Sequence, residues 1–217
     1  MKNVGVLLSG CGVYDGSEIH ETVITLLAIE RNGAETVCMA PDIPQHHVVN
    51  HLTGQTEEET RNVLVESARI ARGEITDIKH IRTADIDALV IPGGFGAAKN
   101  FSDFAIKGKD AEVHPEVRRL ITEMADAKKP IGAMCISPAV LAKVLENRHP
   151  GVTIGNDLGT AEAIEAMGST HTVCDAAAIH VDNENMLVTT PAYMTGPSIS
   201  YVAEGIEKMV KKVLEMA

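Results

Sequence analysis

The chain has 217 residues, of which 45% are apolar and 23% are charged. This balance excludes a disordered chain, and the length predicts a single domain spanning residues 1–217. Nineteen Lys and Arg stand against thirty Asp and Glu, which leaves a net charge of −11. Because that charge repels phosphate backbones and anionic membranes, we expect neither a nucleic acid nor a membrane as a partner.

The compartment is predicted from apolar runs and cysteines. No apolar run approaches the roughly 18 residues of a membrane span, and the opening run is too short for the core of a signal peptide. The four cysteines include no C-x-x-C pair, which indicates free thiols in a reducing compartment. We therefore expect a cytoplasmic protein.

Strands and helices alternate along the first part of the chain. Short, unalternating apolar runs predict strands that are buried on both faces, and capping residues followed by helical spacing predict helices. In chain order, the predicted elements are a strand at 4–8, a helix from its cap Ser17 to Gly33, a strand at 35–40, a polar, histidine-rich loop at 44–56, a helix from its cap Thr56 to Gly73 and a strand at 87–91.

The second part continues the alternation. Strands that alternate with helices of this length argue for an α/β protein with a layered sheet. In chain order, the sequence predicts a glycine-rich bend at 92–96, a helix at 115–128, a strand at 130–134, a helix at 136–145, strands near 152–154, 178–181 and 186–190, and a terminal amphipathic helix at 197–216.

Three of the predicted strand ends carry reactive or glycine-rich segments, which are Ser9–Gly12, Pro92–Gly96 and Met134–Pro138. Because sites in open α/β sheets form at the carboxyl ends of the strands, we expect these segments to converge. Cys135 would lie on a sharp strand-to-helix turn, where the helix dipole lowers the pKa of a thiol and makes it a nucleophile. The N–H groups of Gly94 and Ile136 are candidates for binding an oxyanion. The alternative is an inert, buried cysteine.

Two acids could serve such a thiol. Glu18 and Glu21 lie one turn apart at the start of the first predicted helix, and either could carry a proton. The alternative is a solvated pair that complements the helix dipole. Cys11 could line the same pocket, whereas Cys38 and Cys174 are expected to be packing residues.

Cofactor patterns are weaker. The glycines of Gly10–Gly16 resemble a dinucleotide fingerprint with one extra residue, which is poor evidence for a nucleotide. His46, His47 and His51 could bind Zn²⁺, but the segment lacks cysteine or acidic ligands and any helix signal, so a solvated loop is favoured. We expect neither a cofactor nor a metal.

Longer runs carry a resemblance to known proteins. Some resemble the PfpI/ThiJ superfamily, which includes the class I amidotransferase-like domains, and others are similar more specifically to the ElbB-type glyoxalases, also named enhancing lycopene biosynthesis or sigma cross-reacting proteins. The resemblance covers essentially the whole chain. The superfamily runs are Pro92–Asn100, Cys135–Ala139 and Glu21–Ile24, and the ElbB-type runs are Ser9–Glu21, His51–Gly54 and Thr189–Met194.

The resemblance implies a flavodoxin-like three-layer sandwich with a mostly parallel central sheet, often in a homodimer. It also implies a nucleophile elbow at Cys135 and assigns the acid to Glu21 rather than Glu18. Gly93, Glu18 and Cys11 are then candidates for contacting the substrate. No metal or cofactor is implied.

One departure from the superfamily concerns histidine. Ile136 follows Cys135 where many members have a histidine, and Asn156 occupies the stretch where a downstream histidine would align. Both differences disfavour a Cys-His-acid triad. His180 with Asp182 could still supply a distant base, although an alternating His-x-Asp pair is usually the solvent-facing surface of a strand.

The function implied is conversion of glyoxal or methylglyoxal to its hydroxy acid without a cofactor. Cys135 would form a hemithioacetal, Glu21 would relay a proton through an enediol-like species, and water would hydrolyse the thioester. Activity on glycated groups could underlie it. A different class of function is a redox or carbonyl sensor, or an accessory protein of isoprenoid biosynthesis, because an accessible thiolate also oxidises reversibly. Hydrolysis of glutamine is the weakest alternative, since it needs a histidine base.

Overall fold

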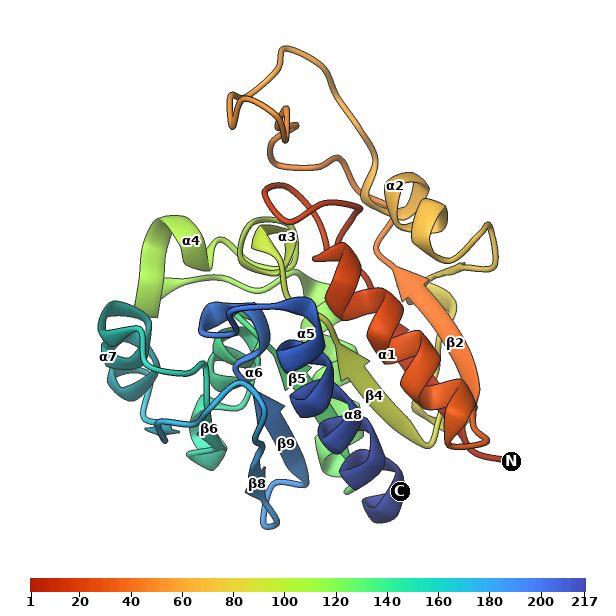
Figure 1. Cartoon of the computed structure of the whole chain (residues 1–217), viewed down its shortest axis with the longest axis vertical. Coiled ribbons are helices and arrows are strands. Elements are labelled where there is room, and N and C mark those ends of the chain that lie inside the picture. Colours follow the sequence, from red (N-terminus) through yellow and green to blue (C-terminus); the bar gives the residue numbers. More distant parts are fainter.

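The computed structural model describes residues 1–217. A seven-stranded sheet in the order β3-β2-β1-β4-β5-β9-β8 forms its centre (Figure 1). All neighbouring strands are parallel except β8, which pairs antiparallel with β9 at one edge. The strands of this sheet are β1 (Asn3–Leu7), β2 (Glu35–Ala40), β3 (Thr76–Asp77), β4 (Ala88–Ile91), β5 (Ile131–Met134), β8 (His180–Asp182) and β9 (Leu187–Thr190).

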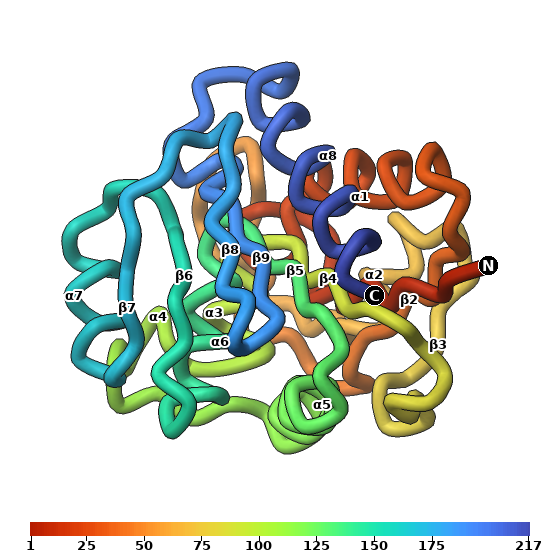
Figure 2. Tube along the Cα trace, turned by 90° about the horizontal axis from the view of Figure 1, so that it is seen from below, coloured from red at the N-terminus to blue at the C-terminus, as the bar shows by residue number.

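Helices cover both faces of the sheet, which confirms the predicted α/β layers. Figure 2 shows α1 and α8 side by side on one face and α5 on the other. The helices are α1 (Ile19–Arg31), α2 (Val63–Ile70), α3 (Phe95–Lys99), α4 (Phe104–Lys107), α5 (Pro115–Asp126), α6 (Pro138–Val144), α7 (Leu158–Ala166) and α8 (Ile199–Met216), with short 3₁₀ turns η1 (Ile78–His80), η2 (Thr83–Asp85), η3 (Gly108–Asp110), η4 (Glu146–Arg148) and η5 (Ala192–Met194). No helix is both long and apolar enough to span a membrane.

Each central strand contributes to two hydrophobic cores. In β4, Leu89 and Ile91 pack into the core beneath α5, whereas Ala88 and Val90 pack into the core beneath α1 and α8. All four residues are fully buried, and this double burial is the reason that the strand has no polar alternation in its sequence.

The helix predicted from Thr56 is wrong at its start. Thr56 pairs with Val49 in an isolated bridge, and α2 begins only at Val63, where the Asn62 side chain accepts the N–H of Val65 at 3.1 Å. The acids at 57–59 therefore lie in extended, exposed chain, because the backbone around them pairs within a long excursion, residues 41–62. In Figure 1 this excursion projects at the top of the molecule.

Other elements also depart from the sequence prediction. Ser17 is not the cap of α1, because its hydroxyl accepts the N–H of Ser9 at 2.8 Å, and Glu18 caps the helix instead. The strand predicted at 152–154 is β6 (Gly151–Val152), which pairs with β7 (Thr170–His171) in a separate small sheet. Five elements have no counterpart among the predicted ones, namely α3, α4, α7, β3 and β7.

Candidate functional site

Cys135 lies on the tight turn expected between β5 and α6. Its φ of 58° is in the left-handed region, which a residue with a side chain rarely adopts. Its N–H donates to the carbonyl of Thr190 at 3.1 Å, and the hydroxyl of Ser137 donates to the carbonyl of Pro92 at 2.6 Å. The ends of β9 and β4 therefore hold the turn in place.

Glu21 reaches this turn from the first turn of α1 and is completely buried. Its Oε2 accepts the N–H of Gly93 at 2.8 Å, and its Oε1 accepts the N–H of Tyr193 at 3.2 Å. The carboxyl also interacts with the Cys135 thiol. An acid and a thiol from distant parts of the chain thus form one buried pair.

Gly93 explains how the two side chains can come so close. A Cβ atom at Gly93 would lie 2.3 Å from Cys135 Cβ, 2.9 Å from its sulfur and 2.7 Å from Glu21 Oε2. No side chain fits there without displacing the thiol or the carboxyl. The glycine-rich end of β4 therefore leaves the space in which the thiol and the carboxyl lie next to each other.

Burial determines the protonation of the pair. Burial, together with the smaller effect of the nearby negative charge of Glu18, raises the pKa of Glu21 to about 8, although the N–H groups of Tyr193 and Gly93 oppose this rise. Burial also raises the pKa of the Cys135 thiol well above its ordinary value, and the charge of Glu21 adds to the effect. The predicted lowering of the Cys135 pKa is therefore wrong, because desolvation exceeds the stabilisation offered by the helix start.

The N–H groups of Gly94 and Ile136 lie at the sulfur. Both act as hydrogen-bond donors toward the Cys135 thiol and lower its pKa, against the larger effect of burial. These are the two N–H groups that the sequence predicted as hydrogen-bond donors to an oxyanion. An oxygen atom bonded to a carbon on this sulfur would form within reach of the same donors.

Glu18 and Cys11 have different surroundings. The Glu18 carboxylate accepts the N–H of Glu21 at 2.7 Å, so it caps α1 and fixes the first turn. Cys11 is half-buried, and burial and the charge of Glu66 raise its pKa. Its charged neighbours are Glu66, Arg69, Asp15 and Arg61 rather than Glu21, so Cys11 is not part of the Cys135–Glu21 pair.

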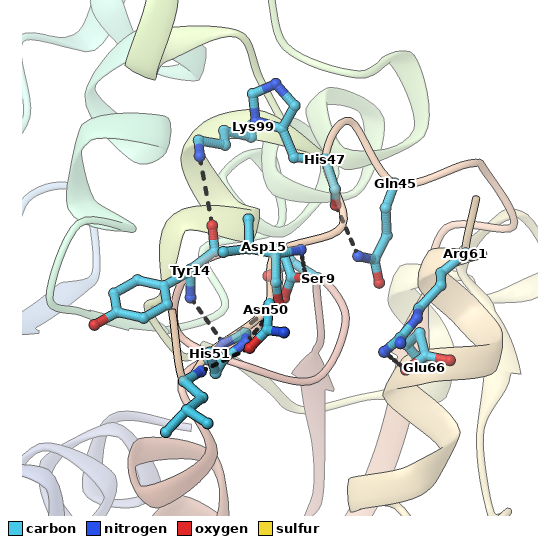
Figure 3. Close-up of polar contacts among 12 residues, drawn as sticks. Ser9, Tyr14, Asp15, Gln45, His47, Asn50, His51, Arg61, Glu66 and Lys99 are labelled. Carbon is cyan, nitrogen blue, oxygen red and sulfur yellow. Dashed lines mark hydrogen bonds and ion pairs between the residues drawn. The ribbon is translucent and has the colours of Figure 1, made fainter. Parts of the chain in front are cut away.

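The histidine-rich excursion packs on the loop after β1 (Figure 3). His51 Nε2 accepts the N–H of Tyr14 at 3.2 Å, and Val49 donates its N–H to Asp15 at 2.8 Å. A Cβ atom at Gly12 would lie 2.5 Å from His51 Nε2, so the excursion packs closely against the glycine-rich loop. No group of three potential ligands in the molecule could hold a metal ion.

No histidine hydrogen-bonds to Cys135. His180 and Asp182 belong to β8, which β9 separates from β5. Asp182 accepts the N–H of Gly151 at 2.8 Å, and Asn156 is exposed. The distant base considered for His180 is not adjacent to the thiol.

Two residues beside Glu21 were not predicted from the sequence. Tyr193 supplies one of the two N–H groups on its carboxyl, and His20 bonds to the Tyr193 hydroxyl at 2.9 Å. Both lie in sequence runs that carried the family resemblance, but nothing in either run indicated that the two would meet.

Comparisons with known proteins identify the family. A model of the DJ-1/PfpI family matches residues 11–190. The chain belongs to the DJ-1/PfpI family. The human glutamine amidotransferase-like class 1 domain-containing protein 3, mitochondrial, is 51% identical over 98% of this chain and 82% of its own length. The rat ES1 protein homolog, mitochondrial, is 49% identical over 98% of this chain and 83% of its own.

A solved structure supports the assignment of this protein to the DJ-1/PfpI family. The isoprenoid biosynthesis protein with an amidotransferase-like domain from Ehrlichia chaffeensis is 41% identical, with a TM-score of 0.94, and the match covers 100% of this chain and 99% of that one. The expected superfamily and the class I amidotransferase-like fold are confirmed.

The expected cytoplasmic location is wrong. The human and rat relatives are both named mitochondrial, which contradicts the expectation. Free thiols and the lack of a long apolar run do not identify the compartment, because both are compatible with more than one.

Proposed function

We propose that this protein is a cofactor-independent glyoxalase of the ElbB type, which converts glyoxal or methylglyoxal to the corresponding hydroxy acid. The observation that carries the proposal is the contact between the buried Cys135 thiol and the Glu21 carboxyl, whose pKa burial raises to about 8. A carboxyl that titrates near neutral pH can both accept and return a proton during one turnover.

The proposed reaction begins with the thiol. Glu21 in its carboxylate form takes the S–H proton as the sulfur of Cys135 adds to the aldehyde carbon, and it then gives this proton to the former carbonyl oxygen, which becomes the hydroxyl of a hemithioacetal. The N–H groups of Gly94 and Ile136 would stabilise the negative charge that develops on this oxygen.

The second step is an internal proton transfer. Glu21 removes the hydrogen of the former aldehyde carbon as a proton, the electron pair forms a carbon–carbon double bond, and Glu21 passes this proton to the adjacent carbonyl oxygen to give an enediol. Glu21 then removes the proton of the hydroxyl on the sulfur-bearing carbon, whose oxygen becomes the thioester carbonyl, and donates a proton to the adjacent carbon, which gives the thioester of the hydroxy acid. Water then cleaves the thioester and regenerates the thiol, so the oxidation of one carbon balances the reduction of its neighbour without an external oxidant.

The burial of Cys135 supports a small substrate. Cys135 is 8% exposed, and the principal surface hollows are lined by other residues. A dicarbonyl of two or three carbons needs little space beside the sulfur. Glycated groups on larger molecules could reach the sulfur only if the residues that cover it moved, which makes these groups the weaker substrate class.

A sensor or an accessory protein of isoprenoid biosynthesis is the second candidate. The name of the Ehrlichia chaffeensis relative, an isoprenoid biosynthesis protein, favours the accessory role. Fast oxidation by peroxide requires a thiolate at rest, whereas burial raises the pKa of Cys135. A thiol that needs a base to ionise suits turnover better than sensing.

The decisive experiment compares two cysteine variants. Cys135→Ala should reduce the conversion of glyoxal to glycolate by on the order of 10³-fold or more, because no other group can form the thioester. Cys11→Ala is the matched control and should keep turnover near that of the wild type. Undiminished activity of Cys135→Ala would exclude the mechanism, and negligible wild-type turnover with rapid peroxide oxidation of Cys135 would favour the sensor.

A further inference from the structure

Two residues without a part in the proposed reaction meet beside the buried acid. His20 precedes Glu21 in α1, and Tyr193 lies in η5, directly after β9. His20 Nδ1 and the Tyr193 hydroxyl are hydrogen-bonded at 2.9 Å, and the centroids of the two rings are 5.8 Å apart. We call this pair the clasp. It joins the first turn of α1 to the end of the sheet.

The backbone on the Tyr193 side of the clasp is strained. Ala192 has a φ of 45°, in the left-handed region that costs free energy for a residue with a Cβ atom. Cys135, at the end of the neighbouring strand, is left-handed as well, with a φ of 58°. The turn at Ala192 leads into the N–H of Tyr193, which donates to Glu21 Oε1 at 3.2 Å. Strain that persists beside reactive groups marks a functional constraint.

We propose that His20 and Tyr193 are positioning residues, whose clasp holds the strained Ala192 turn against α1 and so keeps the Tyr193 N–H on the Glu21 carboxylate. The inference rests on the proposed role of Glu21 as the proton carrier. The clasp lies outside the Cys135–Glu21 pair and keeps a fraction of the Glu21 carboxyls ionised near neutral pH.

The sign of the effect follows from the groups that face Glu21. Glu18 on the same helix disfavours the carboxylate, and the Cys135 thiol faces it from the end of β5. The N–H groups of Gly93 and Tyr193 favour the carboxylate, and these two bonds are the main opposition to burial. If the clasp is broken, the Tyr193 bond lengthens, so the pKa of Glu21 rises further and less carboxylate is present at neutral pH.

The test is a direct titration of Glu21. Protein with ¹³C-labelled glutamate carboxyls is titrated by NMR, and the Glu21 signal is identified by its loss in Glu21→Gln. Tyr193→Phe and His20→Ala should each raise the titration midpoint by about one pH unit, because a hydrogen bond to a charged group is lost. The double variant should show no larger rise than either single variant, since both remove the same bond.

Matched variants separate positioning from general damage. His20→Asn keeps a polar atom near the position of Nδ1 and should retain the wild-type midpoint. Tyr201→Phe removes another tyrosine hydroxyl bond, 2.7 Å to Asp175, from α8, and should change nothing at Glu21. His20 is exposed, so His20→Ala tests the bond even if Tyr193→Phe fails to fold.

Two outcomes distinguish this inference from the proposed function. Midpoints in Tyr193→Phe and His20→Ala that equal those of the wild type and of Tyr201→Phe would overturn the clasp, whatever the activity. A raised midpoint in a protein that does not turn over glyoxal would support the clasp and remove only the glyoxalase assignment, because the titration needs no substrate.

Discussion

The loops after β1 and β5 each carry a cysteine, but only Cys135 lies against a buried carboxyl. Cys135 after β5 is buried against the Glu21 carboxyl, whose pKa lies near 8, and two N–H groups act on its sulfur. Cys11 after β1 has Glu66 and Arg69 as neighbours, and these two are committed to an ion pair of 3.0 Å. A thiol at the end of a strand is therefore not sufficient, because reactivity also requires a proton carrier whose pKa suits the working pH.

The largest expected effect separates the two acids of α1. Glu21→Gln should reduce kcat/KM for glyoxal by about 10²–10⁴-fold, because proton transfer is lost. Glu18→Gln keeps an oxygen that can accept the N–H of Glu21, so the cap of α1 survives and the rate should change by only about 3-fold. Steady-state kinetics on both variants measure the difference. Equal losses in the two variants would mean that Glu21 acts only through the structure of the helix.

A second expected effect concerns stability against pH. Folding keeps Glu21 protonated up to about pH 8, whereas the unfolded chain releases this proton near the ordinary value of 4.5. The folded state therefore binds one proton more than the unfolded state between these values, and the stability contributed by Glu21 is complete below this window and falls as pH rises through it. The expected fall is on the order of 4 kcal/mol between pH 4.5 and 9.

The measurement is the free energy of unfolding in urea for the wild type and Glu21→Gln at several pH values. The difference between the two proteins should move in favour of the glutamine variant as pH rises, since only the wild type must ionise a buried carboxyl. Tyr201→Phe, which leaves both acids at the start of α1 in place, serves as the control. A difference that stays constant from pH 5 to 9 would show that Glu21 is ionised throughout.

The features that depend on local sequence, such as strands and the turn at Cys135, could be predicted. The unalternating run at 4–8 and the run at 87–91 predicted central strands, and both are confirmed as β1 and β4. The sharp turn at Cys135 followed from a strand that meets a helix. The direction of the Cys135 pKa did not follow, because it depends on burial and on Glu21, which reaches the sulfur from α1.

The same limit explains the errors elsewhere. The acids after Thr56 resemble the first turn of a helix, but the excursion pairs Pro44 with Asn62 and holds this stretch extended. Helix α7 escaped prediction because most of its residues are at least partly exposed and only Ile164 is fully buried, so it has almost no apolar periodicity. Long-range pairing and weak amphipathicity leave no pattern that local rules can detect.

The smallest expected effects test two glycines that pack closely against Cys135 and Cys11. Gly93→Ala places a Cβ atom 2.3 Å from Cys135 Cβ, and Gly16→Ala places one 2.3 Å from the backbone nitrogen of Cys11. Both should destabilise the fold by about 1–3 kcal/mol, because a packed interior does not accommodate an added methyl group without shifts. Only Gly93→Ala should also change the rate at which iodoacetamide labels Cys135, since only this methyl group displaces the thiol from Glu21.

A third glycine provides the baseline for both measurements. Gly159 lies in α7, and the only atom near its added Cβ is Asp157 Oδ2 at 3.9 Å. Gly159→Ala should stabilise the protein by about 0.5–1 kcal/mol, because alanine favours the helix, and leave labelling of Cys135 unchanged. Urea unfolding and peptide mass spectrometry report the two quantities separately. If Gly16→Ala altered the labelling of Cys135 as strongly as Gly93→Ala, the two strand ends would be mechanically coupled, and the reactivity of Cys135 could not be attributed to its contact with Glu21 alone.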